Sequence, residues 1–202
     1  MNVKLIQQTP NAINTISNIA SICYDSDPKD PMRLVKHLYK NGHHSVFEHI
    51  YFTFKIEGIS RACSHQLVRH RMCSFTQRSQ RYCSEEDFEY VTPPSLSDNL
   101  FYNNDMRDIA NEYSSYQEVV PNEDARYILP NACCTDLYLS CNLRELIHLA
   151  NERLCCKAQW EIRELVQKMV ALVDRELQFM LVPKCRSGRI ICNTPCNKKE
   201  EN

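Results

Sequence analysis

The side chains best suited to chemistry gather in one basic stretch, RHRMCSFTQRSQRY, from Arg69 to Tyr82. It holds four arginines, one histidine, two serines and one threonine, with no acidic residue and no glycine. The planar guanidinium group of arginine can hold a phosphate or a carboxylate through two parallel hydrogen bonds. Each such charge-assisted bond contributes roughly 1.5–3 kcal/mol. The stretch therefore has the composition of an anion-binding segment.

Three interpretations of this basic stretch remain open on composition alone. It could be a solvated basic strip, a nucleic-acid groove in which Phe75 and Tyr82 stack bases, or a site for small anionic ligands. The chain has three glycines, so neither GxGxxG nor GxxxxGK[ST] can be written anywhere in it. These two loops bind phosphate through backbone N–H groups. An anionic ligand would therefore be held by side chains, with the arginines as the first candidates.

Metal binding is a second possible chemistry. The candidate ligands are His43, His44 and His49, and the cysteines Cys185, Cys192 and Cys196 near the C-terminus. The spacing Cys-x6-Cys-x3-Cys lacks the paired CxxC of a typical zinc site and offers no obvious fourth ligand. We therefore expect no metal.

The chain has twelve cysteines, which could indicate a disulfide framework. Disulfide scaffolds are usually short secreted chains. Cys63, Cys133 and Cys141 lie in apolar or helical patterns, where a thiol acts as a small hydrophobic side chain. We expect reduced thiols.

The periodicity of apolar residues predicts the helices and strands that must position these side chains. Helical patterns cover 10–23, 31–41, about 60–71, 97–120 (with Ser97 as its cap) and most of 142–181. The last of these starts at a capping box formed by Asn142 and Glu145 and carries an apolar stripe of Leu165, Met169, Leu172, Val173 and Leu177. Alternation predicts a strand over 50–58 and a short one over 87–94, and 126–140 is strand or irregular. This is an α+β pattern, with a mixed or antiparallel sheet flanked by helices.

Length and charge limit the class of protein. The 202 residues predict one catalytic domain over 1–183 and a flexible, cysteine-containing tail over 184–202. A net charge of −1 argues against a protein that coats nucleic acid or membranes with its whole surface. The sequence shows neither a signal-peptide pattern nor a membrane-spanning stretch, so we expect a cytoplasmic protein without nucleic-acid or membrane partners.

The order of the residues carries more information than their composition. Arg69-His70-Arg71, seven residues, then Ser79-x-Arg81 resembles the signature of flavin-dependent thymidylate synthases. Three further segments resemble that family in the same order: NGHHSVFEH (41–49), ARYILP (125–130) and NLRELIHLANERLCCKAQWEIR (142–163). The resemblance covers residues from about 40 to 163.

The resemblance implies an activity and a set of partners. The family converts dUMP to dTMP with methylenetetrahydrofolate as carbon donor, FAD as redox carrier and NADPH as the usual reductant. Carbon transfer would run through the reduced flavin, followed by a hydride from the flavin to the pyrimidine. The resemblance also implies a homotetramer with FAD at the subunit interfaces.

Site residues carry over by position. For FAD they are Ser45, Arg69, His70, Arg71, Gln77, Asn142, Leu143, Arg144 and His148. For dUMP they are Gln66, Leu67, Val68, Arg69, Gln77, Arg78, Ser79, Gln80, Arg81, Arg126 and Arg153. Many relatives have an acid or glycine where this chain has Gln77 and Gln80.

Ser79 and Arg153 form the predicted catalytic set. A serine nucleophile needs an adjacent general base, and the motif supplies none, so we interpret Ser79 as positioning the nucleotide. The resemblance places Arg153 against the uracil, where a guanidinium can stabilise developing negative charge. Two alternatives remain: a nucleic-acid module, and a classical thymidylate synthase whose nucleophile would be the cysteine of Pro195-Cys196.

Overall fold

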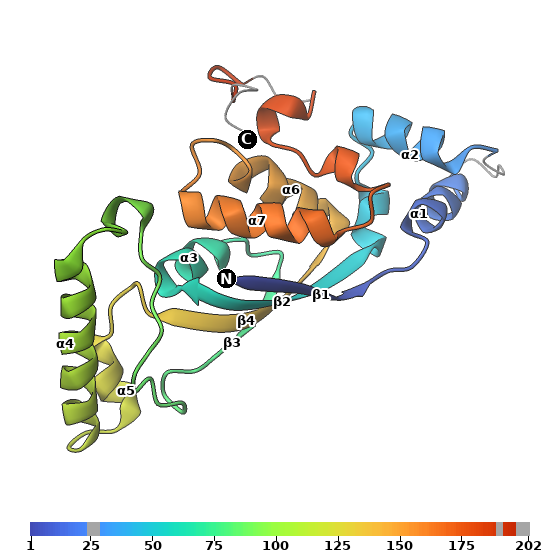
Figure 1. Cartoon of the computed structure of the whole chain (residues 1–202). Helices are drawn as coiled ribbons and strands as arrows, with labels where there is room; N and C mark the ends of the chain where they lie inside the picture. The colour runs from blue at the N-terminus through green and yellow to red at the C-terminus, as the bar shows by residue number, and fades with distance from the viewer. Residues whose placement is uncertain (24–28, 189–191, 197–202) are drawn as a thin grey trace. The chain divides into compact units, whose positions relative to one another are not determined.

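The computed structural model describes residues 1–23, 29–188 and 192–196 (Figure 1). The chain divides into two compact units. Unit 1 comprises residues 1–2, 56–69 and 75–138, and unit 2 comprises the described residues of 3–55, 70–74 and 139–202. Within the described ranges, no helix is long and apolar enough to cross a membrane.

Four strands form one antiparallel sheet in the order β1-β2-β4-β3. They are β1 (Asn2–Gln8), β2 (Tyr51–Ser60), β3 (Ser74–Gln77) and β4 (Cys134–Asn142). In β2 the alternating side chains Phe52, Phe54 and Ile56 are fully buried, as the sequence predicts. With the helices that accompany this sheet, the α+β prediction is confirmed.

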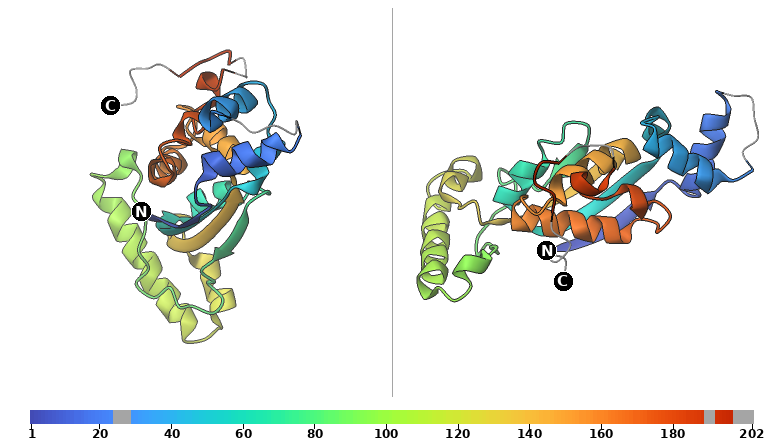
Figure 2. Two further views of the ribbon diagram at one scale, coloured as in Figure 1. Left: turned by 90° about the vertical axis from the view of Figure 1, so that its right-hand side faces the viewer. Right: turned by 90° about the horizontal axis from the view of Figure 1, so that it is seen from above.

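Unit 1 contains helices α3 (Arg61–Leu67), α4 (Leu100–Gln117) and α5 (Asn122–Ala125), with 3₁₀ turns η2 (Pro94–Leu96) and η3 (Arg126–Ile128). Helices α4 and α5 lie side by side (Figures 1 and 2). Met106 of α4 packs in a hydrophobic cluster with Phe88 and Cys133.

Two sequence predictions for unit 1 are corrected. The short strand over 87–94 is reduced to one antiparallel bridge between Tyr90 and Cys133, because Pro93 and Pro94 end any extension of the pairing. The cap of α4 is Asn99, not Ser97, because the Asn99 side chain accepts the backbone N–H groups of the first turn.

Unit 2 contains α1 (Ala12–Ser21), α2 (Pro31–Lys40), η1 (Ser45–His49), α6 (Leu143–Arg153), α7 (Trp160–Leu172), η4 (Gln178–Met180) and η5 (Lys184–Arg186). The predicted N-cap is confirmed, since the Asn142 side chain accepts the N–H of Glu145 at 2.9 Å, whereas the Glu145 carboxylate faces His70. Helices α6 and α7 pack together (Figure 2).

The C-terminal helical prediction is too long. Helix α7 ends at Leu172, and Val173 is extended with ψ 147. Leu172 is 41% exposed, whereas Val173 and Leu177 are buried after the chain has turned. The continuous stripe from Leu165 to Leu177 is therefore made by two segments rather than by one helix.

Helix α3 is shorter than the predicted 60–71 segment. It ends at Leu67, and Val68 is its cap residue. His70 lies beyond the helix and is only 6% exposed, with its ring against the carboxylate of Glu145. Because β-branched Val68 contributes little helix propensity, the burial of His70 decides the backbone here. The prediction that residues 66, 69 and 70 share one helical turn is therefore wrong.

Candidate active site

Unit 1 has a polar pocket of about 220 Å³ at the start of α3. Its lining residues are Arg61, His65, Gln80, Arg126, Tyr127, Leu129, Pro130 and Asn131. The N–H of Arg61 donates to Cys133 O and that of Ala62 to Asn131 O, both at 3.0 Å, so the helix start is pinned to this wall. With two arginines, a histidine and two amides, the pocket is suited to a phosphate-sized anion.

Two arginines of the basic stretch already have acidic partners in unit 1. Arg78 Nε lies 3.2 Å from Glu85 Oε1, and Arg81 Nη2 lies 2.9 Å from Glu123 Oε2. The hydrogen bond and charge of Glu85 raise the pKa of Arg78. The Arg81–Glu123 pair is exposed on both sides and contributes at most about 1 kcal/mol, so an anionic ligand can replace Glu123 at small cost. The Glu85 carboxylate is 8% exposed, so separating Arg78 from it costs more.

The hydroxyl of Ser79 holds a turn. Its Oγ accepts the backbone N–H of Arg81 at 3.3 Å, and its carbonyl accepts the N–H of Cys83 at 3.0 Å. These contacts orient the backbone that carries Arg81. They fit the interpretation that Ser79 positions a ligand and does not attack it.

The side chains of Gln77 and Gln80 donate within unit 1. Gln77 Nε2 donates to the hydroxyls of Ser64 (3.1 Å) and Thr135 (3.2 Å). Gln80 Nε2 donates to Cys133 Sγ at 3.7 Å, and the residue is 8% exposed. The two amides therefore attach the basic stretch to β4 and to the residue just before it. Gln80 also lines the pocket.

Unit 2 contains a chain of three polar side chains, which we call the buried chain: Glu145 and His70 are buried, and Arg153 is half-buried. Arg153 Nε donates to His70 Nε2 at 3.0 Å, so this ring nitrogen is an acceptor. His70 Nδ1 then carries the proton and faces Glu145 Oε1 at 3.3 Å. Glu145 therefore fixes the tautomer of His70, and His70 fixes the position of the Arg153 guanidinium.

His148 lies beside this chain, one turn after Arg144 on α6. Its ring packs edge-on to that of His70, with centroids 5.5 Å apart. Its ring nitrogen, the His70 ring and the Glu145 carboxylate all lie within 4.8 Å of one another. The hydrogen bond from Arg153 already occupies the Nε2 lone pair of His70, so this group is a hydrogen-bonded chain rather than a ligand set.

A second pocket, of about 540 Å³, opens over α6 in unit 2. It is lined by His44, Glu48, Met72, Asn142, Arg144, Glu145, Ile147, His148, Asn151 and Glu152. The guanidinium of Arg144 pairs with the carboxylate of Glu48. This cavity is thus lined by three predicted cofactor residues, Asn142, Arg144 and His148. Glu145, the carboxylate of the buried chain, lines it as well.

The predicted site residues are distributed over both units. Unit 1 carries Gln66, Leu67, Val68, Arg69, Gln77, Arg78, Ser79, Gln80, Arg81 and Arg126, and unit 2 carries Ser45, His70, Arg71, Asn142, Leu143, Arg144, His148 and Arg153. Leu67 and Leu143 are fully buried, so ligand contact there could come only from backbone atoms. Ser45, Val68, Arg69 and Arg71 are exposed, and Ser45 does not line the pocket over α6.

The structure adds residues that the sequence analysis missed. In unit 1 these are Arg61, His65, Tyr127 and Asn131, and in unit 2 they are Glu48, Met72, Glu145, Ile147, Asn151 and Glu152. His44, considered above only as a metal ligand, lines the same pocket of unit 2. Arg61 and His65 could have been found, because they are four apart on one face of the helix predicted over about 60–71. Glu145 gave no such signal, since its place three residues after Asn142 indicated only a capping role.

Comparisons with known proteins agree with this geometry. A family model described as Thymidylate synthase complementing protein matches residues 4–177. The chain is 41% identical over 190 residues to a Flavin-dependent thymidylate synthase of Geobacter sulfurreducens, covering 86% of this chain and 82% of the relative. It is 41% identical over 189 residues to a protein of the same name from Pyrococcus furiosus, covering 84% and 78%.

A solved structure supports the same relationship. The crystal structure of Thymidylate Synthase X from Helicobacter pylori with FAD and dUMP has a TM-score of 0.77 and 25% identity. It matches 90% of this chain and 97% of that protein.

Proposed function

Because the chain belongs to the family of flavin-dependent thymidylate synthases, we propose that it converts dUMP to dTMP with FAD as its redox cofactor. The observation that carries this proposal is the buried chain in unit 2. His70, the centre of the signature triplet, holds the guanidinium of Arg153 at 3.0 Å. The signature and the end of α6 are thus joined by one hydrogen bond between residues 83 apart in sequence.

The residues of unit 2 fit a flavin nucleotide. Arg144, His148 and Asn142 give the pocket over α6 cationic and amide donors, which suit the pyrophosphate and the polar ring edge of FAD. Arg71 is exposed in the same unit and can add a further donor. When bound, FAD supplies hydride transfer, which no protein side chain can carry out.

The residues of unit 1 fit the phosphate of dUMP. Arg126 and Arg61 line a pocket large enough for a phosphate, and Arg81 stands in an exposed, exchangeable pair. Ser79 holds the turn before Arg81, which positions the nucleotide without bonding to it covalently. Gln66, Gln77, Arg78 and Gln80, with the backbone of Leu67 and Val68, complete the proposed set.

Arg153 is the proposed activating residue. A guanidinium stays protonated throughout the reaction and can stabilise negative charge that develops on the uracil ring. The hydrogen bond to His70 fixes its position before substrate arrives, so less reorganisation is needed in the transition state. Glu145 contributes by holding His70 in the tautomer that accepts this bond.

We extend the proposal to the remaining partners. Methylenetetrahydrofolate would supply the carbon and NADPH the electrons, and the active form would be a cytoplasmic homotetramer with FAD at subunit interfaces. Residues 1–183 would form the catalytic domain and 184–202 the tail. Light scattering of the purified protein that gives the mass of a single chain would contradict the tetramer.

A flavin spectrum tests the assignment of FAD. The purified protein should absorb as a flavoprotein, and NADPH should bleach it in the absence of oxygen. His70→Ala and Arg71→Ala should each lower the FAD content, while Arg175→Ala, an exposed arginine after α7, should leave it unchanged. Wild-type FAD content in both site variants would contradict the assignment.

A further inference from the structure

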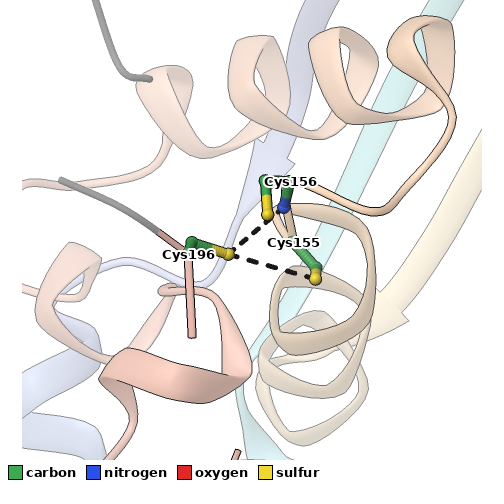
Figure 3. A group of neighbouring side chains, drawn as sticks. All are labelled: Cys155, Cys156 and Cys196. Carbon is green, nitrogen blue, oxygen red and sulfur yellow. Dashed lines mark hydrogen bonds between the residues drawn. The ribbon is translucent and has the colours of Figure 1, made fainter. Parts of the chain in front are cut away.

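Three cysteines from distant parts of the chain meet in unit 2 (Figure 3). Cys155 and Cys156 follow directly after α6, and Cys196 comes from the C-terminal segment. Their sulfur atoms all lie within 4.8 Å of one another, with 4.0 Å between Sγ of Cys196 and Sγ of Cys155. The spacing of the tail cysteines alone could not reveal this, because two of the partners lie about forty residues earlier.

These separations are those expected around a single metal ion. A tetrahedral zinc site has Zn–S bonds of about 2.3 Å, which places its sulfur ligands about 3.8 Å apart. A disulfide would join two sulfurs at about 2.05 Å. A four-iron cluster binds each cysteine to a different iron and so holds the sulfurs farther apart. Thiolate ligands bind soft or borderline-soft metal ions. Zn²⁺ is one of these, prefers four ligands in a tetrahedral arrangement and has no redox chemistry.

The surroundings of the three sulfurs suit sulfur ligands of a metal. The backbone N–H of Cys156 donates to Cys196 Sγ at 3.2 Å, a bond that orients and stabilises a charged sulfur. Lys157 and Lys184 line the adjoining cavity, where their ammonium groups offset the net charge of −2 that four thiolates leave around Zn²⁺. Cys185 and Cys192 line the same cavity as Cys155, so a local movement of the C-terminal segment could bring either thiol to the three sulfurs.

We propose that Cys155, Cys156 and Cys196, with either Cys185 or Cys192 as fourth ligand, form a structural zinc site. Four protein ligands leave no open position, as in structural sites and unlike catalytic ones. The thiols lose their protons on binding, so zinc uptake releases protons. The ion would join the C-terminal segment to the connection between α6 and α7.

This site would also position Arg153. Cys155 and Cys156 lie two and three residues after Arg153, with Leu154 as the cap of α6. The tail is further attached by Lys157 Nζ to Thr194 Oγ1 at 2.7 Å. Metal binding would therefore fix the C-terminal end of α6, although the zinc site itself does not depend on the proposed enzyme activity.

Metal content of the full-length protein is the first test. Protein purified under reducing conditions with zinc in the medium should contain about one zinc ion per chain. Cys155→Ser and Cys196→Ser should each lose most of it, and one of Cys185→Ser and Cys192→Ser should do the same. Cys23→Ser, an exposed thiol outside the cluster, is the matched control and should keep the metal.

A cobalt titration provides a test that needs no variant. Co²⁺ added to the reduced, zinc-free protein should give the visible absorption of a tetrahedral cobalt thiolate, and Zn²⁺ should displace it. Full zinc content in the Cys155→Ser and Cys196→Ser variants, or no thiolate absorption with Co²⁺, would overturn the proposal. A Cys155–Cys196 disulfide in protein alkylated without reduction would overturn it as well, in favour of a redox bond.

Discussion

The arginines of the two proposed functional regions are held in opposite ways. In unit 1, the arginine side chains of the pairs Arg78–Glu85 and Arg81–Glu123 are 42% and 50% exposed, although the Glu85 carboxylate is 8% exposed. In unit 2, Arg153 is half-buried, and its partner His70 is 6% exposed. The guanidinium groups of unit 1 therefore reach water, whereas that of Arg153 is held by a buried ring.

This difference separates binding from chemistry. An exposed ion pair contributes at most about 1 kcal/mol, so a ligand phosphate can take over the guanidinium. A buried polar chain that is fully hydrogen-bonded is costly to interrupt, so its geometry persists while the substrate changes. Unit 1 is therefore suited to bind and release a nucleotide, and unit 2 to present one cation in a fixed position.

The largest expected effect is on catalysis by the buried chain. Arg153→Ala should lower kcat for dTMP formation by about 10²–10³-fold with a smaller change in the KM for dUMP, because the lost interaction acts mainly in the transition state. Oxidation of NADPH by the flavin should persist. Arg175→Ala is the control, and a change in KM alone would show that Arg153 only binds.

The next effect concerns stability. Glu145→Ala leaves His70 Nδ1 without its acceptor in a buried site, which should lower the free energy of unfolding by about 2 kcal/mol. Glu145→Gln keeps an acceptor oxygen and should recover most of this loss. Urea denaturation measures both variants, and kcat should follow the same order. Equal stability in Ala and Gln variants would show that the Glu145–His70 contact contributes nothing.

A smaller effect is expected for Arg81 of the exposed pair Arg81–Glu123. Arg81→Ala should raise the KM for dUMP about tenfold with little change in kcat, because its contact with phosphate is the same in ground and transition states. Arg107→Ala, on the exposed side of α4, should have no effect. Loss of kcat in Arg81→Ala would remove the distinction between the two regions.

Removing the competing carboxylate should have a still smaller effect, of opposite sign. Glu123→Gln frees Arg81 from its ion pair and should lower the KM for dUMP about two- to fivefold, corresponding to an exposed pair of at most about 1 kcal/mol. Steady-state kinetics at low salt should show it, and high salt should diminish it. A higher KM would mean that Glu123 itself contributes to nucleotide binding.

Both units contain a buried thiol with a raised pKa, so we expect the two units to behave alike in this property. Burial raises the pKa of Cys133 in unit 1 to about 12, and a hydrogen bond with Cys73, together with burial, raises that of Cys141 in unit 2. Both thiols should resist alkylation at pH 9, while exposed Cys23 is labelled. Because the folded protein holds these protons more tightly, stability should fall as pH rises above 9. Mass spectrometry of alkylated protein checks the labelling.

Much of the architecture is predictable because local signals agree with the tertiary structure. The alternation of β2, the proline start of α2 and the Asn142 cap of α6 all appear as predicted. The polar four-residue strand β3 is too short for any periodicity to identify it. The end of α3 depends on the burial of His70, which no local pattern records.

The order of arginines in the signature likewise indicates the proposed site, but the acidic partners of these arginines lie elsewhere in the sequence. Glu85 and Glu123 lie outside the acid-free stretch, and Glu145 is explained locally by its capping role. Only the folded structure shows that the Glu145 carboxylate orients His70. The cysteines after α6 meet Cys196 for the same reason, since their contact spans forty residues of sequence.

The most direct test of the account is the complete reaction. Wild-type protein incubated without oxygen with dUMP, methylenetetrahydrofolate and NADPH should form dTMP in proportion to the NADPH oxidised, with the flavin bleached on reduction and recoloured on turnover. Omission of any one substrate should abolish dTMP. Formation of dTMP without flavin reduction, or flavin turnover without any dTMP, would contradict the proposed function.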